Sequence, residues 1–344
     1  MDWRTLASIL AVGSVGVAAT VGVIAEPLGH RLGLLDFPDL AGGRKRHARI
    51  TPLVGGTGLV PVVVLATLLT ARILTDGPYA RAQFSWLAGC VAAMFLIGLA
   101  DDRFALGPKV RLLLAVLALS IGIVHAPDLA IGFVRFGGQS TTTLATGWGD
   151  AFTLLCLVGL LNAVNMADGK NGIVIGLGLI WSVILWFRLP PVALPIAASA
   201  FAALAVLMWF NLRGRLFLGD GGSYAISALF GLLAIYAYNH DFAALRADDI
   251  AVMFAVPVFD TIRLMVVRAY ARRSPFEGDR NHLHHHLHRR FGWPRGLWLY
   301  LAIVAGPNLG ALLWPGTGMV WLLVTLLLYV ATLVYARIRA GEPA

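Results

Sequence analysis

The sequence consists largely of apolar runs long enough to cross a lipid bilayer. A membrane-spanning helix needs about 20 predominantly apolar residues. Eleven runs approach this length: 5–24, 53–71, 84–100, 110–125, 148–165, 172–188, 191–209, 222–239, 250–270, 297–314 and 318–337. Several of them are short or contain Gly and Pro, so the expected number of spans lies between nine and eleven. Only 13% of the residues are charged and the mean hydropathy is +0.78, whereas soluble domains carry about 25% charged residues.

The apolar runs predict helices, not the strands of a membrane barrel. Backbone polar groups inside a bilayer must be hydrogen-bonded within the protein, and these runs lack the alternation of barrel strands. We therefore predict an all-α integral membrane protein, a polytopic bundle of about 11 transmembrane helices. The connecting segments are too short to fold alone, which predicts a single membrane domain over residues 1–344. Residues 126–147 are rich in β-branched residues and contain Gly-Gly, which predicts a short hairpin.

Basic residues are concentrated in alternate loops. The segments 25–52, 101–111, 166–171, 210–221 and 271–296, together with the C-terminal tail, hold most of the 27 Lys and Arg residues. Because positive loops stay on the cytoplasmic side, we expect these segments to be cytoplasmic, with the C-terminus inside and the N-terminus and the hairpin outside. The net charge of +9 suits anionic lipid or a phosphorylated substrate. Nucleic acid is not expected, because no aromatic-interleaved basic surface or binding module is present.

Acidic residues are scarce, yet five of them lie at the expected cytoplasmic ends of the helices. They are Asp101, Asp102, Asp168, Asp220 and Asp260. Acids near a membrane are costly and suggest a functional site. Carboxylate and amide oxygens suit Mg²⁺, whose remaining ligands are waters and phosphate oxygens, and a helix N-terminus such as the one expected after "FLGDGG" favours an anion. Metal, basic residues and helix ends together are typical of phosphoryl transfer.

A histidine-rich segment is the second concentration of chemistry. Residues 275–290, "PFEGDRNHLHHHLHRR", hold five of the nine histidines. By itself this segment fits a metal-binding tract as well as a solvated basic loop. Each of the other motifs also has a structural alternative, such as a helix cap or an Asx turn, but four motifs on one expected face favour a shared function. Asp260 and Arg263 lie one helical turn apart, which favours a structural ion pair over a role in the site.

The motifs, taken in order, resemble those of a known family. They are "LDFPDLAGGRKRHARITPLVGG" from Leu35, "DDRF" from Asp101, "NAVNMADG" from Asn162, "FLGDGGS" from Phe217 and "SPFEGDRNHLHHHL" from Ser274. Over most of the chain, from about Leu35 to His288, the sequence resembles the polyprenyl-phosphate N-acetylhexosamine-1-phosphate transferases, glycosyltransferase family 4. It is most similar to the undecaprenyl-phosphate GlcNAc-1-phosphate transferase branch.

The resemblance implies a reaction and its partners. A sugar-1-phosphate, GlcNAc or another N-acetylhexosamine, would pass from a UDP-sugar to undecaprenyl phosphate on the cytoplasmic face, with release of UMP. This step initiates cell-surface glycans such as cell-wall polymers and the O-antigen of lipopolysaccharide. The implied cofactor is Mg²⁺, with Mn²⁺ as a substitute, and the implied location is the bacterial cytoplasmic (inner) membrane. A homodimer formed through apolar helices is compatible with the family.

The resemblance also implies roles for individual residues. The catalytic residues would be Asp101, Asp102 and Asp168, and the metal ligands would be Asp220 and Asn165. The substrate-binding residues would be Lys45, His47, Arg111, Asn171, Arg280, His282, His284, His285 and His286. Direct attack of the lipid phosphate on the sugar-bearing phosphorus is favoured, with Asp101 as positioner or base. A two-step route through a phosphorylated aspartate remains an alternative.

Two positions depart from the pattern of the family and leave the sugar open. Relatives often have Asp or Asn where this chain has Ala105, and most bacterial relatives have Asp where it has Asn171. UDP-GalNAc, UDP-FucNAc and UDP-QuiNAc therefore stay alternatives to UDP-GlcNAc. An ion-coupled transporter is a distant alternative. It predicts internal repeats and acids at the middle of the membrane, whereas this sequence shows no repeat and its acids lie at the expected cytoplasmic ends of the helices. A histidine-rich metalloprotein is also less favoured, since the chain lacks the His-Glu-x-x-His arrangement.

Overall fold

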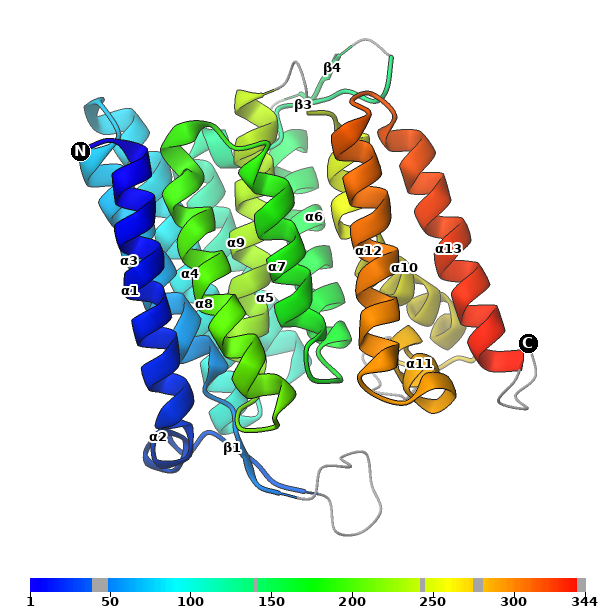
Figure 1. Ribbon diagram of the computed structural model, residues 1–344. Helices are drawn as coiled ribbons and strands as arrows, with labels where there is room; N and C mark the ends of the chain where they lie inside the picture. Colours follow the sequence, from blue (N-terminus) through cyan, green and yellow to red (C-terminus); the bar gives the residue numbers. More distant parts are fainter. Residues whose placement is uncertain (39–48, 139–140, 146, 242–244, 275–280, 339–344) are drawn as a thin grey trace. The chain divides into compact units, whose positions relative to one another are not determined.

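The computed structural model describes residues 1–38, 49–138, 141–145, 147–241, 245–274 and 281–338 (Figure 1). Within these ranges, ten helices are long and apolar enough to cross a membrane. They are α1 (Trp3–Val23), α3 (Gly55–Ile73), α4 (Gly77–Phe104), α5 (Pro108–His125), α6 (Trp148–Ala167), α8 (Leu194–Leu212), α9 (Gly219–His240), α10 (Ala247–Tyr270), α12 (Arg295–Leu313) and α13 (Gly318–Ile338). The prediction of an all-α polytopic membrane protein is confirmed.

The run at 172–188 differs from the prediction of a full span. It forms α7 (Ile173–Trp186), a helix of 14 residues, which is shorter than the roughly 20 residues that a span needs. Gly172 before it has a φ of 89°, and the 3-10 turn η2 (Pro191–Ala193) follows it. The ends of the predicted run lie within two residues of the ends of this helix, so the prediction differs only in counting the run as a full span.

The remaining described elements are short. They are α2 (Ala25–Leu32), α11 (Leu283–Phe291), the 3-10 turn η1 (Pro127–Leu129) and two antiparallel strand pairs. Strand β1 (Leu35–Asp36) pairs with β2 (Thr51–Pro52), and β3 (Phe133–Val134) pairs with β4 (Thr142–Thr143). The second pair confirms the hairpin that was predicted within residues 126–147.

The chain divides into two compact units. Unit 1 comprises Met1–Ala126 and Pro191–Leu229, and unit 2 comprises Pro127–Pro190 and Phe230–Ala344. The first half of α9 belongs to unit 1 and its second half to unit 2. The single membrane domain over residues 1–344 stays a prediction.

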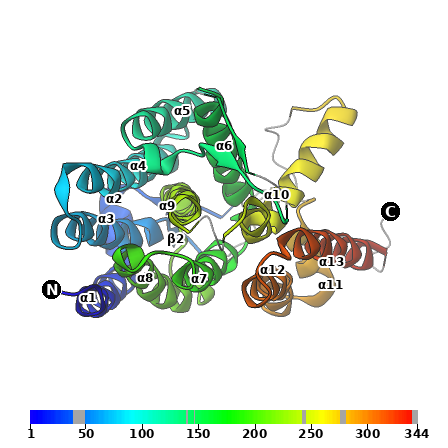
Figure 2. The same cartoon turned by 90° about the horizontal axis from the view of Figure 1, so that it is seen from above.

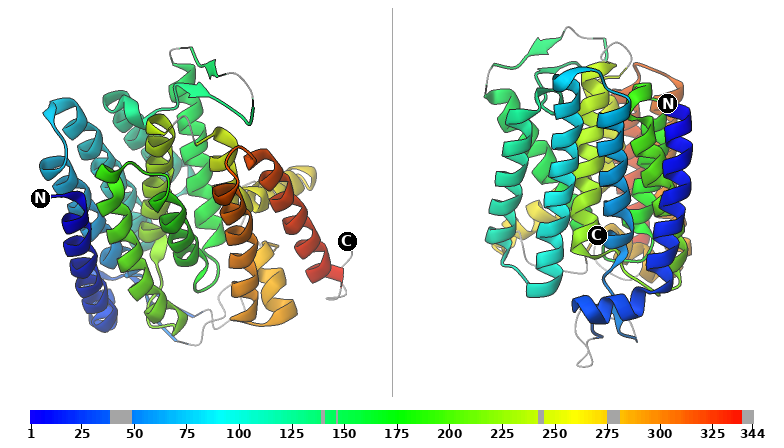
Figure 3. Two further views of the ribbon diagram at one scale, coloured as in Figure 1. Left: turned by 45° about the horizontal axis from the view of Figure 1, so that its top comes forward. Right: turned by 90° about the vertical axis from the view of Figure 1, so that its left-hand side faces the viewer.

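Unit 1 is built on α3, which packs against α1, α4 and α8. Small polar groups join α1 to α8, where the hydroxyls of Ser14 and Ser199 lie 2.7 Å apart in the buried interior. Helix α5 packs on α4. Helix α2 and the strand pair β1–β2 lie together at one end of the unit (Figure 3), and this is the end where α4 stops and α5 and α9 begin.

Unit 2 is centred on α10, which packs against α6, α12 and α13. Helix α10 contains Pro257 and changes direction along its length (Figure 2). Because proline has no N–H to donate to the fourth residue before it, the carbonyl of Met253 is left for another donor. The buried indole Nε1 of Trp181 in α7 donates to it at 2.8 Å. Helix α11 packs against α12 and α13 at one end of the unit.

Candidate functional site

The end of α4 and the start of α5 bring a buried carboxylate and a guanidinium together. The side chain of Asp101 is only 5% exposed, and its Oδ2 lies 2.5 Å from Nη1 of Arg111, one turn into α5. The hydroxyl of Tyr224 in α9 lies 3.5 Å from the same oxygen. A buried carboxylate is stable when a charge-assisted bond of this kind accompanies its desolvation. The predicted catalytic Asp101 and the predicted substrate-binding Arg111 are therefore direct partners.

Helix α9 begins at a close contact between backbones. Its first residue, Gly219, has a φ of 77°, a left-handed conformation that disfavours other residues. A Cβ on Gly98 of α4 would overlap the backbone of Asp220. Two residues before Gly219, the N–H of Phe217 donates to the carbonyl of Pro52 in β2 at 2.8 Å. The chain pattern "FLGDGG" thus allows the first turn of α9 to lie directly on α4.

This contact places Asp102 at the N-terminus of α9. Its Oδ1 accepts the backbone N–H of Asp220 at 2.9 Å, and its Oδ2 accepts that of Gly221 at 3.1 Å. The first amides of a helix have no partner within the helix, and a carboxylate there also interacts favourably with the helix dipole. Asp102 therefore caps α9 from a different helix, and the anion at this helix end is a side chain of the protein itself.

Asp220, beside the pair formed by Asp101 and Arg111, has room for a further ligand. Its side chain is 32% exposed, and its Oδ2 lies 3.8 Å from Nη1 of Arg111, beyond hydrogen-bond distance. Among the described residues, no three His, Cys, Asp or Glu side chains lie close enough together to share a metal ion. A cation at Asp220 would hence keep several water or phosphate ligands. That donor set fits Mg²⁺, which usually binds through one or two carboxylates, better than a four-coordinate zinc site.

In unit 2, the end of α6 and the turn into α7 hold three further predicted residues. Asn165 and Asp168 are three residues apart at the end of α6, and the N–H of Asp168 donates to the carbonyl of Asn165 at 3.2 Å. Asn171 lies in the following turn, where its carbonyl accepts the indole N–H of Trp293 at 3.1 Å. Whether Asn165 and Asp220 hold one metal ion stays a prediction.

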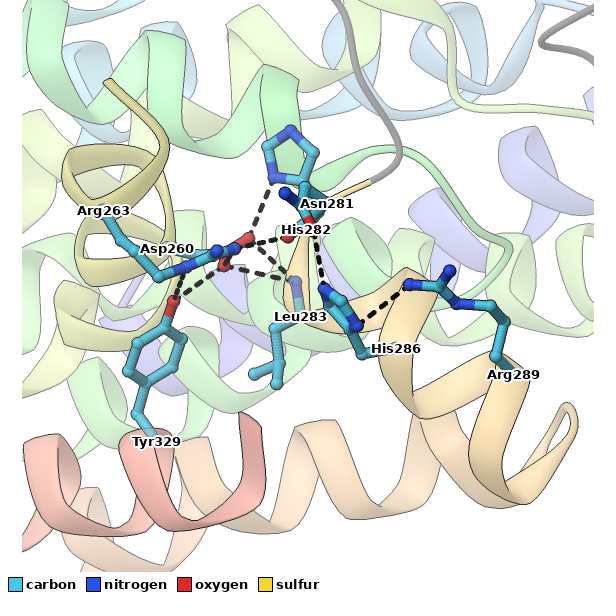
Figure 4. A network of polar contacts seen from close by, with 8 residues as sticks. All are labelled: Asp260, Arg263, Asn281, His282, Leu283, His286, Arg289 and Tyr329. Atoms are coloured by element: carbon cyan, nitrogen blue, oxygen red, sulfur yellow. Dashed lines mark hydrogen bonds and ion pairs between the residues drawn. The ribbon is translucent and has the colours of Figure 1, made fainter. Parts of the chain in front are cut away.

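The histidine segment forms the short helix α11, which starts on a buried acid of α10. Figure 4 shows Asp260 at the centre of this network. Its Oδ2 lies 2.9 Å from Nδ1 of His282, and both of its oxygens accept the N–H of Leu283 at 3.2 Å. Its Oδ1 also accepts from Arg263 at 2.9 Å and from the hydroxyl of Tyr329 at 2.8 Å. The ion pair expected between Asp260 and Arg263 is confirmed.

The other histidines of α11 differ in their surroundings. His284 is 1% exposed, its Nε2 has no hydrogen-bond partner, and a Cβ on Gly169 would overlap that atom. Burial lowers the pKa of His284 well below its usual value, and the rings of His285 and His282 act in the same direction. His286 has both ring nitrogens in contacts near α11, one 3.0 Å from Asn281 Oδ1 and one 2.9 Å from Nη2 of Arg289.

The structure thus gathers the predicted residues in two places. Unit 1 holds Asp101, Asp102, Arg111 and Asp220, and unit 2 holds Asn165, Asp168, Asn171, His282, His284, His285 and His286. Lys45, His47 and Arg280 lie outside the described residues.

Sequence reasoning missed Tyr224, Tyr329 and Trp293. Tyr224 was detectable, since it follows Asp220 by four residues on one helix and so shares its face. Tyr329 lies in an apolar run with no local signal.

The chain is similar to proteins of one enzyme family. The model of the family described as "Glycosyl transferase family 4" matches residues 84–238. The decaprenyl-phosphate N-acetylglucosaminephosphotransferase of Mycobacterium tuberculosis is 30% identical over 301 residues, which cover 76% of this chain and 72% of that relative. The enzyme of the same name from Mycolicibacterium smegmatis is 28% identical, covering 76% of this chain and 71% of the relative. The undecaprenyl-phosphate alpha-N-acetylglucosaminyl 1-phosphate transferase of Escherichia coli is also 28% identical, with the same coverage.

Proposed function

Because this multi-pass membrane protein belongs to glycosyl transferase family 4, we propose that it transfers an N-acetylhexosamine-1-phosphate, GlcNAc-1-phosphate first among the candidates, from a UDP-sugar to undecaprenyl phosphate. UMP is the second product. The observation that carries the proposal is the arrangement of Asp101, Asp220 and Arg111, two acids and one cation at one helix end of unit 1. The printed names of the relatives, which pair a polyprenyl phosphate with N-acetylglucosamine, support the same substrates for this chain.

The proposed reaction is a direct displacement at phosphorus. An oxygen of the lipid phosphate forms a bond to the sugar-bearing phosphorus, the bond from that phosphorus to the bridging oxygen breaks, and UMP leaves with this oxygen. A phosphate monoester has a second pKa of about 6 and is largely dianionic at neutral pH. Little base catalysis is therefore needed, and Asp101 would act chiefly by orienting Arg111 towards phosphate. A phosphorylated aspartate, formed in a two-step route, is the alternative that trapping experiments would reveal.

The remaining residues are proposed to hold charge and to bind the donor. Asp220 is the proposed Mg²⁺ ligand of unit 1, and Asn165 stays the second predicted ligand. Bound Mg²⁺, or Mn²⁺ in its place, would neutralise phosphate charge during the transfer. Asp102 is already bonded to two backbone amides of α9, so its proposed contribution is to hold Asp220 in place. His282 and His285 are the proposed contacts of unit 2 with the UDP-sugar diphosphate, because imidazole donors suit such a group.

The proposed location follows from the substrates. A lipid-linked acceptor requires a membrane enzyme, and a UDP-sugar donor is a soluble cytoplasmic metabolite. We therefore place the reaction on the cytoplasmic face of the bacterial inner membrane, as the initiating step of a cell-surface glycan. The concentration of Lys and Arg in the loops that precede and follow the proposed site residues supports this orientation.

The test is release of UMP by the detergent-purified protein with Mg²⁺ and undecaprenyl phosphate, across UDP-GlcNAc, UDP-GalNAc, UDP-FucNAc and UDP-QuiNAc. We expect lipid-dependent release with one sugar, loss of release in Asp220→Ala and full release in Asp76→Ala. Asp76 is an exposed aspartate at the opposite end of α4 that makes no side-chain cap, so it controls for loss of an acid. Absence of release with every sugar from folded protein would refute the proposal.

A further inference from the structure

The start of α11 depends on a carboxylate that comes from another helix. The first amides of a helix need partners from outside it, and the N-cap residue His282 makes no side-chain cap. The N–H of Leu283 donates instead to both oxygens of Asp260 in α10. Asp260 is 4% exposed, so this bond is made in a place that water does not reach. Asp260 therefore fixes where α11 begins.

The same carboxylate also orients the ring of His282. Its Oδ2 lies 2.9 Å from Nδ1 of His282, and a carboxylate accepts hydrogen bonds only. Nδ1 must then carry a proton, which leaves Nε2 as the ring atom that faces a ligand, and Nε2 donates to a phosphate oxygen when the ring is the imidazolium, with a proton on each nitrogen. Histidine ligands at metal sites are oriented by carboxylates in the same way, and loss of the carboxylate there costs about 10–100-fold in affinity or activity.

Asp260 is itself held on its other side. The hydroxyl of Tyr329 in α13 donates to Oδ1 at 2.8 Å, and Nε of Arg263 lies 2.7 Å from that hydroxyl. Arg263 also donates to Oδ1 and to the carbonyl of Asn281 just before α11. The carboxylate thus has donors from α10, α13 and the start of α11, and it has little freedom to rotate.

Helix α11 and the residue that follows its C-cap also contact the turn after α6. His284, two residues beyond His282, has its Nε2 directly against Gly169, and Trp293, just beyond α11, donates to the carbonyl of Asn171. The first residues of α11 and the turn at 168–171 are therefore positioned together.

We propose that Asp260 is a positioning residue, which acts by holding the Nδ1–H of His282 and the first amide of α11 so that Nε2 of His282 faces the diphosphate of the sugar nucleotide. Tyr329 and Arg263 serve as its supports. The proposal rests on the proposed function for its substrate, but the anchoring of α11 can be measured without it.

The experiment compares Asp260→Asn with Asp248→Asn. Asp248 is an equally buried aspartate of the same helix that accepts two backbone amides, those of Gly137 and Met319, away from α11. In Asp260→Asn we expect kcat/KM for the UDP-sugar to fall about 10–100-fold, with an unchanged KM for undecaprenyl phosphate. The amides of residues 283–287 should exchange hydrogen faster in this variant. Asp248→Asn should change neither the KM values nor the exchange of these amides.

A double-mutant cycle with His282→Gln decides whether Asp260 acts through His282. The variant with both substitutions should be no less active than His282→Gln alone, since residues acting as one unit are not additive. The positioning role would be overturned if the losses of activity in Asp260→Asn and His282→Gln were additive in the double variant, or if Asp248→Asn lowered kcat/KM as much as Asp260→Asn. Unchanged amide exchange in Asp260→Asn would overturn the anchoring. If the unaltered protein releases no UMP, the proposed function and the substrate part of this inference fail together, and the exchange measurement alone decides the anchoring.

Discussion

Replacing Ala105 by glycine should stabilise the protein, whereas an Ala→Gly substitution inside a helix usually destabilises it. Ala105 ends α4 with a φ of 51° and a ψ of 61°, the left-handed conformation, and its N–H donates to the carbonyl of Asp101 at 2.8 Å. Asn and Asp tolerate this conformation better than Ala does.

The magnitude follows from the backbone geometry. A side chain with a Cβ loses about 1–2 kcal/mol in the left-handed region. Glycine also increases the conformational entropy of the unfolded chain, which lowers the free energy of unfolding by about 0.4–1 kcal/mol and offsets part of this gain. Ala105→Gly should thus raise the free energy of unfolding by about 1 kcal/mol, and Ala105→Asn by somewhat less. Ala92→Gly, in the interior of the same helix, should lower it by about 1 kcal/mol.

The assay is denaturant-induced unfolding of the detergent-solubilised protein, with UMP release measured in parallel. An increase in the free energy of unfolding in Ala105→Gly and a decrease in Ala92→Gly would support the reasoning. The reasoning would be refuted if Ala105→Gly destabilised the protein as much as Ala92→Gly. Because the side chain of Ala105 is exposed, we expect little change in UMP release in Ala105→Gly.

Three further predictions concern the site and its packing. Arg111→Met removes the cation that we propose contacts phosphate and should lower UMP release at least about tenfold, since a hydrogen bond to a charged group contributes about 1.5–3 kcal/mol. Lys109→Met, an exposed change in the same helix turn, should not. His284 has a lowered pKa because it is buried, so the unfolded chain binds a proton that the folded protein does not. Stability should then fall as the pH drops below about 6.5, and pH titration of unfolding should give a flatter curve for His284→Gln between pH 7 and 5. Gly98→Ala places a Cβ on the backbone of Asp220 and should lower the unfolding free energy by about 1–3 kcal/mol, whereas Gly89→Ala, which meets nothing within 4 Å, should not; similar values for the two would contradict the close contact.

The sequence alone was sufficient for the helical architecture. Each span must satisfy its own backbone hydrogen bonds in lipid, so it is recognisable from about 20 local residues without knowledge of its neighbours. The ion pair between Asp260 and Arg263 was also predictable from local sequence, because residues three apart on a helix are neighbours. The short hairpin near residues 133 and 143 was also a local signal. The limits of α7 also agree with the predicted run at 172–188 to within two residues, although the helix is too short for a full span.

The roles of the acids were decided only by tertiary structure. Asp102 caps α9 across 118 residues of sequence, because a glycine on α4 lets the two backbones meet. Tyr329 closes the network of Asp260 from 69 residues away, and its apolar surroundings in the sequence contain no sign of this. Likewise, the run of histidines does not show which ring is buried against Gly169 and which is held by Asp260. Local sequence determines helices, but the partner of a buried polar group is set by which helix faces it, and that depends on the packing of the whole unit.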